Sequence, residues 1–288
     1  MQFQLNKNHK KPKMTTQNST SIIVKDFNGV KVHTFLAPYE AAANATHIIE
    51  TENKLVLVDT HFLTPLAQAF KGYALSLNKP IDRIFISHGH PDHYFGLASA
   101  FSEYPAYTLT GIDKVIAEWG PQMIKNQKPM FGDLIPNEVV IPKHTLAPNT
   151  EEVIDGLTYQ YEMVEGAESE AQLLIKLPQL GVIIAQDLVY SGVHLWLGMG
   201  WFDKWIAELQ NILKAEGYSY VLAGHGLPCG KDEVVNCINY LLTAKELFSQ
   251  NLTATEFKSQ LLAKYPYKES PMMFDMYLGF LFGQMSSH

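Results

Sequence analysis

The sequence has 288 residues, of which 47% are hydrophobic and 18% charged, and its formal net charge is -7 at pH 7. This is the composition of a globular protein with a sizeable core. Because a phosphate backbone requires clustered cations, the acidic balance argues against nucleic acid as a partner. We also expect no membrane partner, since no window of the sequence is apolar enough to span a bilayer.

Residues 1–20 form a polar segment with a basic run, KNHKKPK, at 7–13, and we expect a flexible tail there. The segment has no apolar stretch of the length that a signal peptide requires. The sequence contains two cysteines, Cys229 and Cys237, whose spacing matches neither a zinc finger nor a redox pair. Such a low count is typical of a reducing compartment, and these features together predict a cytoplasmic location.

The first elements after the tail are strands. SIIVKDFNGVKVHTFLAP (21–38) predicts two strands around an Asn-Gly turn. THIIETENKLVLVDTHF (46–62) predicts a second pair, whose latter strand ends at Asp59. Thr64 and Pro65 then predict the N-cap and first position of a helix with an apolar stripe.

The middle of the chain predicts a buried strand running into a His-rich loop at 81–90, a strand at 107–111 and a helix at 112–126. Residues 127–150 contain four prolines, so we expect a long loop or lid. The remaining elements are expected as three strands, a helix, a strand and two helices. These cover roughly 157–165, 171–177, 181–187, 203–216, 218–226, 232–249 and 254–264.

The strands fall in two blocks, each followed by helices, without a repeat or a clear linker. This order favours a single domain over 21–288, with two sheets sandwiched by helices and a C-terminal helical extension from about 232. The Met-rich and aromatic end, 271–285, is typical of core or of a dimer surface, which is the basis for considering a homo-oligomer.

The strongest chemical signal is SHGHPDHYFG, which contains His88, His90, Asp92 and His93. Alternate histidines at a strand end point to one side of the chain, so both can reach one cation. The adjacent Asp-His pair can serve a second cation close by, as in a two-metal clamp. A purely structural cluster of hydrogen-bonded histidines is the alternative, and this density of ligand types argues against it.

With these residues the chain resembles the metallo-β-lactamase superfamily, whose hallmark is His-x-His-x-Asp-His. The resemblance extends over most of 21–230, because three further motifs appear in order. They are an Asp closing an early strand (Asp59), an Asp closing a later strand (Asp187) and a His after another strand (His225). The resemblance implies an α/β fold, a four-layer αββα sandwich of two mixed β-sheets flanked by helices.

One motif of the family departs from its usual form. The family supplies a further histidine from a turn between the hallmark and the later Asp, but the histidine in that interval, His144, lies in the Pro-rich stretch. The turn at the expected place, VEGAESEAQL (164–173), contains no histidine. Three options follow: the site holds one metal, a ligand position is empty, or a glutamate substitutes.

Glu168 is the strongest candidate for a substitute, because it lies at the turn, two residues after Gly166. The turn resembles the alkylsulfatase branch of the superfamily, in which a Glu of a Gly-x-Glu-Ala-type turn is a metal ligand. Glu165 falls within the preceding strand and Glu170 begins the next. Glu170 as the ligand, or a solvated acidic turn, are the alternatives.

The resemblance implies seven ligands for two divalent metal ions. They are His88, His90 and Glu168 on the first metal, Asp92, His93 and His225 on the second, and Asp187 between the two. Asp92 and Asp187 are the implied catalytic carboxylates, and Asp59 orients the His-rich loop from behind the ligands. Zinc is the expected metal because four histidines remain, with manganese or iron as alternatives for a carboxylate-rich site.

Three further residues are candidates for binding a substrate. His61 and His194 follow strand-end motif residues and are expected at the pocket rim, although a histidine there is as often a satisfied surface residue. Tyr190 could donate a hydrogen bond to a substrate oxygen. The segment VHLWLGMGWF (193–202) is too apolar for an ordinary loop, and either lines a substrate pocket or packs under the next helix.

The implied function is that of a hydrolase, in which a dinuclear-metal-bound hydroxide cleaves an ester-like bond of a small-molecule substrate. Lactones, thioesters, sulfate esters and phosphate esters all fit this machinery. One alternative is iron-dependent redox or oxygen chemistry, but such relatives typically carry a Glu inside the hallmark, where this chain has His90. The other is a metal-binding protein without catalysis, which would require a more broken set of motifs.

Overall fold

The computed structural model describes residues 20–283, so most of the expected tail at 1–20 lies outside the described residues. Strands β1 to β7 form the first sheet in sequence order. Strands β1 to β4 are antiparallel, and β4 to β7 are parallel. Their bounds are β1 Ser21–Phe27, β2 Val30–Leu36, β3 Ala45–Glu50, β4 Leu55–Val58, β5 Ile81–Phe85, β6 Ala106–Leu109 and β7 His144–Leu146.

The second sheet has the order β12-β11-β10-β9-β8. Strands β8 to β11 are antiparallel, and β11 and β12 are parallel, so this sheet is mixed as well. Its strands are β8 Thr150–Ile154, β9 Leu157–Glu165, β10 Ala171–Leu177, β11 Val182–Ser191 and β12 Tyr220–Gly226.

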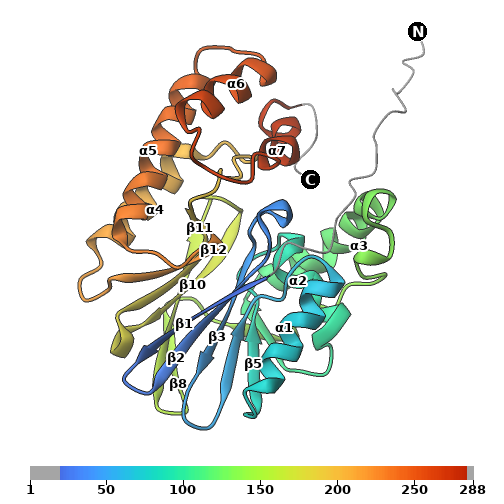
Figure 1. The fold of residues 1–288 in the computed structure, drawn as a ribbon, viewed down its shortest axis with the longest axis vertical. Coiled ribbons are helices and arrows are strands. Elements are labelled where there is room, and N and C mark those ends of the chain that lie inside the picture. The colour runs from blue at the N-terminus through green and yellow to red at the C-terminus, as the bar shows by residue number, and fades with distance from the viewer. Residues whose placement is uncertain (1–19, 284–288) are drawn as a thin grey trace.

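The helices complete four layers. They are α1 Thr64–Ser76, α2 Pro91–Gly96, α3 Ile112–Phe131, α4 Phe202–Lys214, α5 Lys231–Phe248, α6 Ala254–Lys264 and α7 Met273–Leu281. Short helical turns lie at η1 Tyr39–Ala41, η2 Leu97–Phe101, η3 Gly132–Leu134 and η4 Pro178–Leu180. Figure 1 shows α1, α2 and α3 on the side of the first sheet and α4 and α5 on the side of the second. The predicted four-layer αββα sandwich is confirmed.

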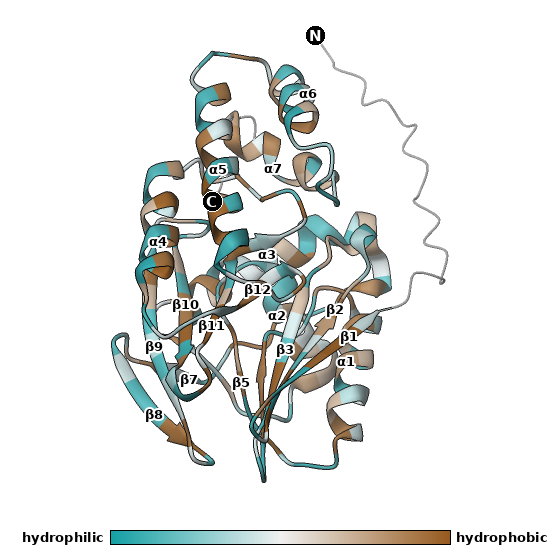
Figure 2. Ribbon diagram, turned by 60° about the vertical axis from the view of Figure 1, so that its left-hand side comes forward, coloured by the Kyte–Doolittle hydropathy of each residue, from teal (hydrophilic) through white to brown (hydrophobic). Residues whose placement is uncertain are grey.

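The apolar residues explain this layering. In β9 the buried residues Leu157, Tyr159 and Tyr161 alternate with partly exposed ones, as in a strand with one covered face. Strand β11, by contrast, is buried along nearly its whole length, because the first sheet covers one face and helices cover the other. Figure 2 shows hydrophobic strands inside, and helices whose polar side faces outward.

The predicted loop over 127–150 is wrong in part. Helix α3 continues through Pro129 to Phe131, and β7 and part of β8 also fall in this range. Tertiary contacts override the helix-breaking residues, because Ile124 is buried and the ammonium of Lys128 binds the carbonyls of Gly132 and Ile135 beyond the helix end.

Three smaller expectations also differ from the structure. Leu63, and not Thr64, is the N-cap of α1, and the Thr64 hydroxyl is hydrogen-bonded to Ser99 at 2.9 Å. Strand β11 extends to Ser191, so that Asp187 lies within the strand. The C-terminal segment contains α7, which the sequence pattern alone did not predict. The apolar residues all around α7 obscure its helical period.

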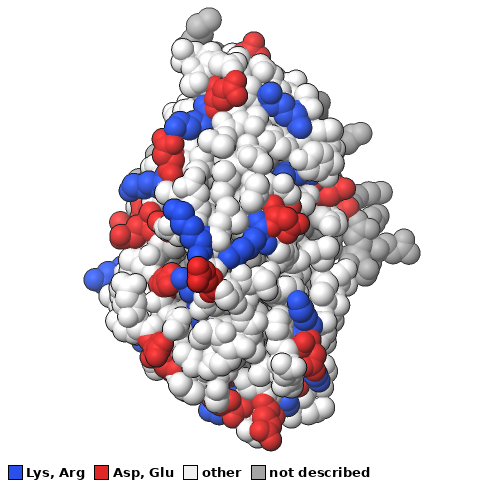
Figure 3. Space-filling view, turned by 90° about the vertical axis from the view of Figure 1, so that its left-hand side faces the viewer, with Lys and Arg blue, Asp and Glu red and all other residues white. Residues whose placement is uncertain are grey.

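None of the helices in residues 20–283 combines the length and the apolar character that a membrane crossing requires. On the face of the molecule shown in Figure 3, lysines and arginines are interspersed with aspartates and glutamates. Such alternation lacks the clustered cations of a phosphate-binding surface on that face.

Candidate metal centre

Five segments bring the predicted ligands together at one end of the two sheets. The loop after β5 carries His88 and His90, the first turn of α2 carries Asp92 and His93, the β9–β10 turn carries Glu168, β11 carries Asp187, and β12 carries His225. The side chains form two clusters of candidate ligand atoms, one of His88, His90, Glu168 and Asp187, the other of Asp92, His93 and His225.

The hallmark loop is shaped by its glycine and proline. Pro91 begins α2, where its missing N–H and fixed φ are tolerated, and His90 before it is extended. A Cβ on Gly89 would lie 2.9 Å from a methyl group of Val115 in α3, so this position has no room for a side chain. The extended backbone before Pro91 and the helix after it turn both halves of the motif toward one place.

In the first cluster, Nδ1 of His90 lies 3.0 Å from Nε2 of His88 and 3.2 Å from Oε1 of Glu168. Nε2 of His88 is 3.6 Å from Oε2 of Glu168. The Glu168 side chain comes from the turn and is only 1% exposed, whereas Glu165 and Glu170 are exposed. Of the three glutamates in the turn, Glu168 is therefore the one that reaches the histidines.

In the second cluster, Oδ2 of Asp92 lies 3.5 Å from Nε2 of His93 and 3.3 Å from Nε2 of His225. Asp187 connects the clusters: its Oδ1 is 3.2 Å from Nε2 of His93, and its Oδ2 is 3.2 Å from Nε2 of His225. The same Oδ2 lies 3.9 Å from Nε2 of His88. This position between the two clusters is what a bridging carboxylate requires.

The residues fit a metal because three of their candidate ligand atoms are buried without a hydrogen-bond partner. Among the described residues, Nε2 of His93, Oε2 of Glu168 and Oδ1 of Asp187 are buried side-chain atoms without a hydrogen bond. Burying such atoms unpaired costs roughly 1–3 kcal/mol each, and more for a charged group. A divalent cation would satisfy all of them with ligand types that suit zinc.

The other ring nitrogen of three histidines is held in place. Nδ1 of His93 donates to Oδ2 of Asp59 at 2.8 Å, and Nδ1 of His225 donates to the carbonyl of Ala42 at 2.8 Å. Nδ1 of His88 contacts the hydroxyl of Ser87 at 2.9 Å, and that hydroxyl donates to Asp59. These contacts leave Nε2 of each ring for a metal, as in known second-layer contacts of metal sites.

Asp59 lies where the sequence predicted an orienting residue. It follows β4, has a positive φ of 61° and is fully buried. Besides His93 and the Ser87 hydroxyl, it accepts the Ser87 backbone N–H at 2.8 Å and the side-chain amide of Gln186. One carboxylate thereby fixes both the start of the His-rich loop and one ligand ring.

We predict that Asp59→Asn lowers the metal affinity of the protein by about 10- to 100-fold, the usual cost of losing such a partner of a ligand histidine. The substitution keeps the shape, but it replaces an acceptor for the imidazole N–H of His93 by a group that is half donor. Competition with a metal chelator measures the affinity. An unchanged affinity would show that His93 does not need this contact.

Tyr190 has a different place from the one expected. Its ring stacks on His225 with 4.9 Å between centroids and 3° between planes, and it is fully buried. Its hydroxyl donates to Oδ2 of Asp187 at 2.9 Å and lies 3.3 Å from Oε1 of Glu168. Burial and the carboxylate of Asp187 raise the pKa of Tyr190 well above its ordinary value, so the phenol keeps its proton and orients two ligands.

The expectation that His61 and His194 face the pocket rim is wrong, because both are fully buried in the core. His61 is packed against Phe70 and hydrogen-bonded to Thr46 at 3.0 Å. Nδ1 of His194 lies 3.0 Å from the hydroxyl of Tyr240 in α5. For both rings, burial lowers the pKa below the ordinary value, to about 3 for His61 and about 4 for His194.

The buried carboxylates of the centre favour positive charge on the neighbouring histidines. Burial disfavours charge on His93, but Asp187, Asp92 and Asp59 hold its pKa well above the ordinary value. Burial acts against charge on His225 as well, and Asp187 and Asp92 raise its pKa to about 10. The buried carboxylates therefore favour positive charge at this place, and a divalent cation bound there would supply it.

The comparisons with known proteins identify the family. The model of the metallo-beta-lactamase superfamily matches residues 41–225, well over half of the chain. The chain belongs to the metallo-β-lactamase superfamily. Together with the two ligand clusters, this match supports a candidate metal site at the place expected for that superfamily.

Relatives agree with this assignment. The Alkyl/aryl-sulfatase BDS1 of Saccharomyces cerevisiae is 25% identical over 183 residues, which cover 52% of this chain and 28% of that protein. The aligned part is therefore less than a third of the relative's length. The metallo-beta-lactamase from Pontibacter korlensis is 20% identical with a TM-score of 0.59, covering 77% of this chain and 99% of that one. The mono-zinc form of FIM-1 from Pseudomonas aeruginosa is 17% identical with a TM-score of 0.56, covering 79% and 98%.

Two polar residues that contact the site were not predicted from the sequence. The amide of Asn44 donates to Oδ2 of Asp92 at 3.2 Å, and the amide of Gln186 in β11 of the second sheet donates to Asp59. Neither residue belongs to a motif, and no local signal separates it from other polar residues beside strands. His144, in contrast, stacks on Tyr107 at 4.5 Å at the start of β7 and belongs to neither ligand cluster, in agreement with its rejection as a ligand.

Proposed function

We propose that this protein is a dinuclear metallo-hydrolase that cleaves an ester-like bond of a small molecule. The observation that carries the proposal is the position of Asp187, whose two carboxylate oxygens face histidines of both clusters within a buried centre. A single-metal site would not need a second cluster of buried ligands on the other side of this carboxylate.

His88, His90 and Glu168 would hold the first cation, and Asp92, His93 and His225 the second, with Asp187 shared. When bound, such cations make water a nucleophile at neutral pH and polarise the bond to be cleaved. The chain's own residues supply the rest: Asp59 and Tyr190 keep the ligands in place through the hydrogen bonds described above. In this proposal no side chain needs to act as a general base.

Glu168 gives the centre a distinct charge. The ligand set contains three carboxylates, where a histidine at this position would leave two. A more anionic set makes the bound cations weaker Lewis acids and shifts the preference toward harder ions such as manganese or iron. Four histidine ligands still favour zinc.

The family leaves the substrate open among lactones, thioesters, sulfate esters and phosphate esters. Sulfate esters are the first to test, because one relative carries the name alkyl/aryl-sulfatase. The short alignment with that relative supports a shared site architecture and leaves the choice of substrate to experiment.

The test is the metal dependence of hydrolysis. Protein stripped by a chelator is reloaded separately with zinc, manganese or iron, and each form is assayed against panels of the four ester classes. We expect no hydrolysis without metal and recovery on reloading, with zinc or manganese. Activity that appears only with iron, and only together with oxygen or a thiol, would replace the hydrolase by a redox enzyme.

A further inference from the structure

The segment between β11 and α4 has two sides. Its residues Leu195 and Leu197 are buried in the hydrophobic core beneath the C-terminal helices. Trp196 and Met199 are only partly buried. Trp196 takes part in both expected roles, because it packs against this core cluster and still leaves part of its side chain exposed to a ligand.

Trp196 lies directly against the candidate metal centre. Its indole meets the ring of His90 edge to face, with 4.7 Å between centroids and 62° between planes. His90 is itself the partly exposed ligand of the first cluster, with a side chain 27% exposed. A molecule that reaches the metals past His90 thus passes the face of Trp196.

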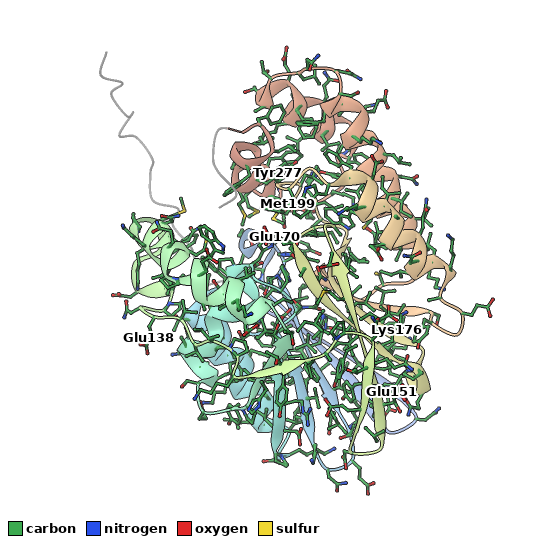
Figure 4. All side chains as sticks on the ribbon, turned by 180° about the vertical axis from the view of Figure 1, so that it is seen from behind. Glu138, Glu151, Glu170, Lys176, Met199 and Tyr277 are labelled. Carbon is green, nitrogen blue, oxygen red and sulfur yellow. The ribbon has the colours of Figure 1, made fainter. Side chains whose placement is uncertain are left out.

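The C-terminal extension adds a residue to the apolar surface at Trp196, which we call the apolar wall. Phe280 of α7 packs on Trp196 with 6.2 Å between ring centroids. Phe280 and Met199 are partly exposed, and neither belongs to the two core clusters of the described residues. In the view of Figure 4, Met199 appears between Tyr277 of α7 and Glu170 of the turn that carries Glu168. Phe280 and Met199 are therefore apolar side chains outside the core clusters that lie on the same side of the molecule as Trp196.

Glu168 and the apolar side chains also border a common packed void, which is too small to hold a water molecule. Its lining includes Ala167, Glu168, Trp196, Met199 and Trp205. The same carboxylate thus faces a metal cluster and an apolar surface. Ligand sites typically combine a largely apolar lining with a few polar groups that orient the ligand. A metal-facing carboxylate beside apolar side chains therefore suits a substrate with one polar and one apolar part.

Gly198 fixes the place of the indole. A Cβ on Gly198 would lie 2.3 Å and 2.4 Å from the Cζ2 and Cη2 atoms of Trp196. Contacts this short do not occur, so any side chain there would push the indole away. Gly198 does not have a positive φ, and its backbone therefore accepts alanine without strain.

We propose that Trp196, backed by Phe280, binds an apolar alkyl or aryl group of the substrate next to the hydrolysed bond. Trp196 is then a specificity-determining residue. This proposal rests on the proposed hydrolase function, and it narrows the substrate to esters with an apolar arm. An aromatic face of this kind binds alkyl and aryl groups through buried apolar area and offset ring contacts.

The test uses two probes that cannot be hydrolysed, methylphosphonate and phenylphosphonate, titrated into the zinc-loaded protein in a calorimeter. Both present the same anionic head, and only the second has an apolar arm. We expect the wild type to bind phenylphosphonate about tenfold more tightly than methylphosphonate, as a buried phenyl group should provide. Equal affinities would overturn the proposal.

Matched variants locate the preference. The preference for phenylphosphonate over methylphosphonate should largely disappear in Trp196→Ala. It should also largely disappear in Gly198→Ala, which keeps the indole but displaces it. Part of the preference should remain in Trp196→Phe. Tyr267→Ala, which removes an aromatic residue that is 69% exposed elsewhere, should leave it unchanged. Zinc content and the unfolding midpoint of each variant confirm that the fold persists. If a folded Trp196→Ala variant still prefers phenylphosphonate to the same degree, Trp196 does not bind the apolar group of the substrate.

The same samples separate this proposal from the proposed function. A zinc-loaded wild type that prefers phenylphosphonate but hydrolyses no ester in the panels would refute the hydrolase while supporting the apolar wall. A wild type that hydrolyses an ester but binds both probes equally would support the hydrolase and refute the wall.

Discussion

Replacing Glu168 by alanine should lower the metal content from about two equivalents per chain to about one, as expected when a structural ligand of one zinc is lost. The first cluster would keep His88 and His90 and its share of Asp187, and this reduced set should bind a divalent cation weakly. The second cluster would keep Asp92 and two histidines. Elemental analysis of the purified variant after dialysis measures this content.

The turn itself supplies the control. Glu170→Ala removes an exposed carboxylate two residues away and should leave the metal content at the wild-type value. Glu168→His restores the ligand type usual in the family and should recover the second equivalent. Wild-type metal content in Glu168→Ala would show that the first cluster does not depend on this residue.

The order of strands and helices in the sequence predicted two sheets between helices, and the resemblance to the superfamily implied the four layers. It could not predict the end of α3, since Pro129 normally stops a helix and the stabilising contacts of Lys128 come from residues beyond the helix. It also missed β7, a short edge strand, since three residues carry no period. Local rules failed where distant contacts decide the outcome.

In the site, too, some features were predictable from the sequence and others depend on contacts with distant residues. The resemblance to the superfamily implied the seven candidate ligands, with Glu168 in the position of the missing histidine. The structure brings their side chains into two clusters, and most of them lie near strand ends, although Asp187 lies within β11. His61 and His194 also follow such strands, yet both turn into the core, where Thr46 and Tyr240 bind them. The direction of a single side chain depends on neighbours from other elements, and one sequence does not reveal them.

Trp196 illustrates what the structure adds. From the sequence, the apolar segment around it could either line a pocket or pack under a helix. In the structure Leu197 is buried with the C-terminal helices, whereas Trp196 packs against the same core cluster and also contacts the ring of His90. Helix α7 supplies Phe280 to the same wall, so the C-terminal extension contributes to the proposed substrate site.

Replacing Asp187 by asparagine should cause the largest loss of hydrolysis, a fall in kcat/KM of at least about 1,000-fold, or roughly 4 kcal/mol. The oxygens of Asp187 face both clusters, 3.2 Å from His93 and His225 of the second and 3.9 Å from His88 of the first. Asparagine fits the same space, which is tight because a Cβ on Gly224 would lie 1.9 Å from Oδ1 of Asp187. The variant therefore removes charge and one metal-binding oxygen without opening a cavity.

The measurement is kcat/KM on whichever ester the panels identify, together with metal content. Asp203→Asn is the control: its side chain is 77% exposed on α4 and pairs with Lys245, so the loss of its charge should change neither quantity. Because Asp187 would belong to both metal positions, its loss should weaken both, whereas Glu168→Ala should weaken one. If Asp187→Asn keeps two equivalents of metal and an activity within about tenfold of the wild type, or roughly 1.4 kcal/mol, Asp187 does not bridge two metals.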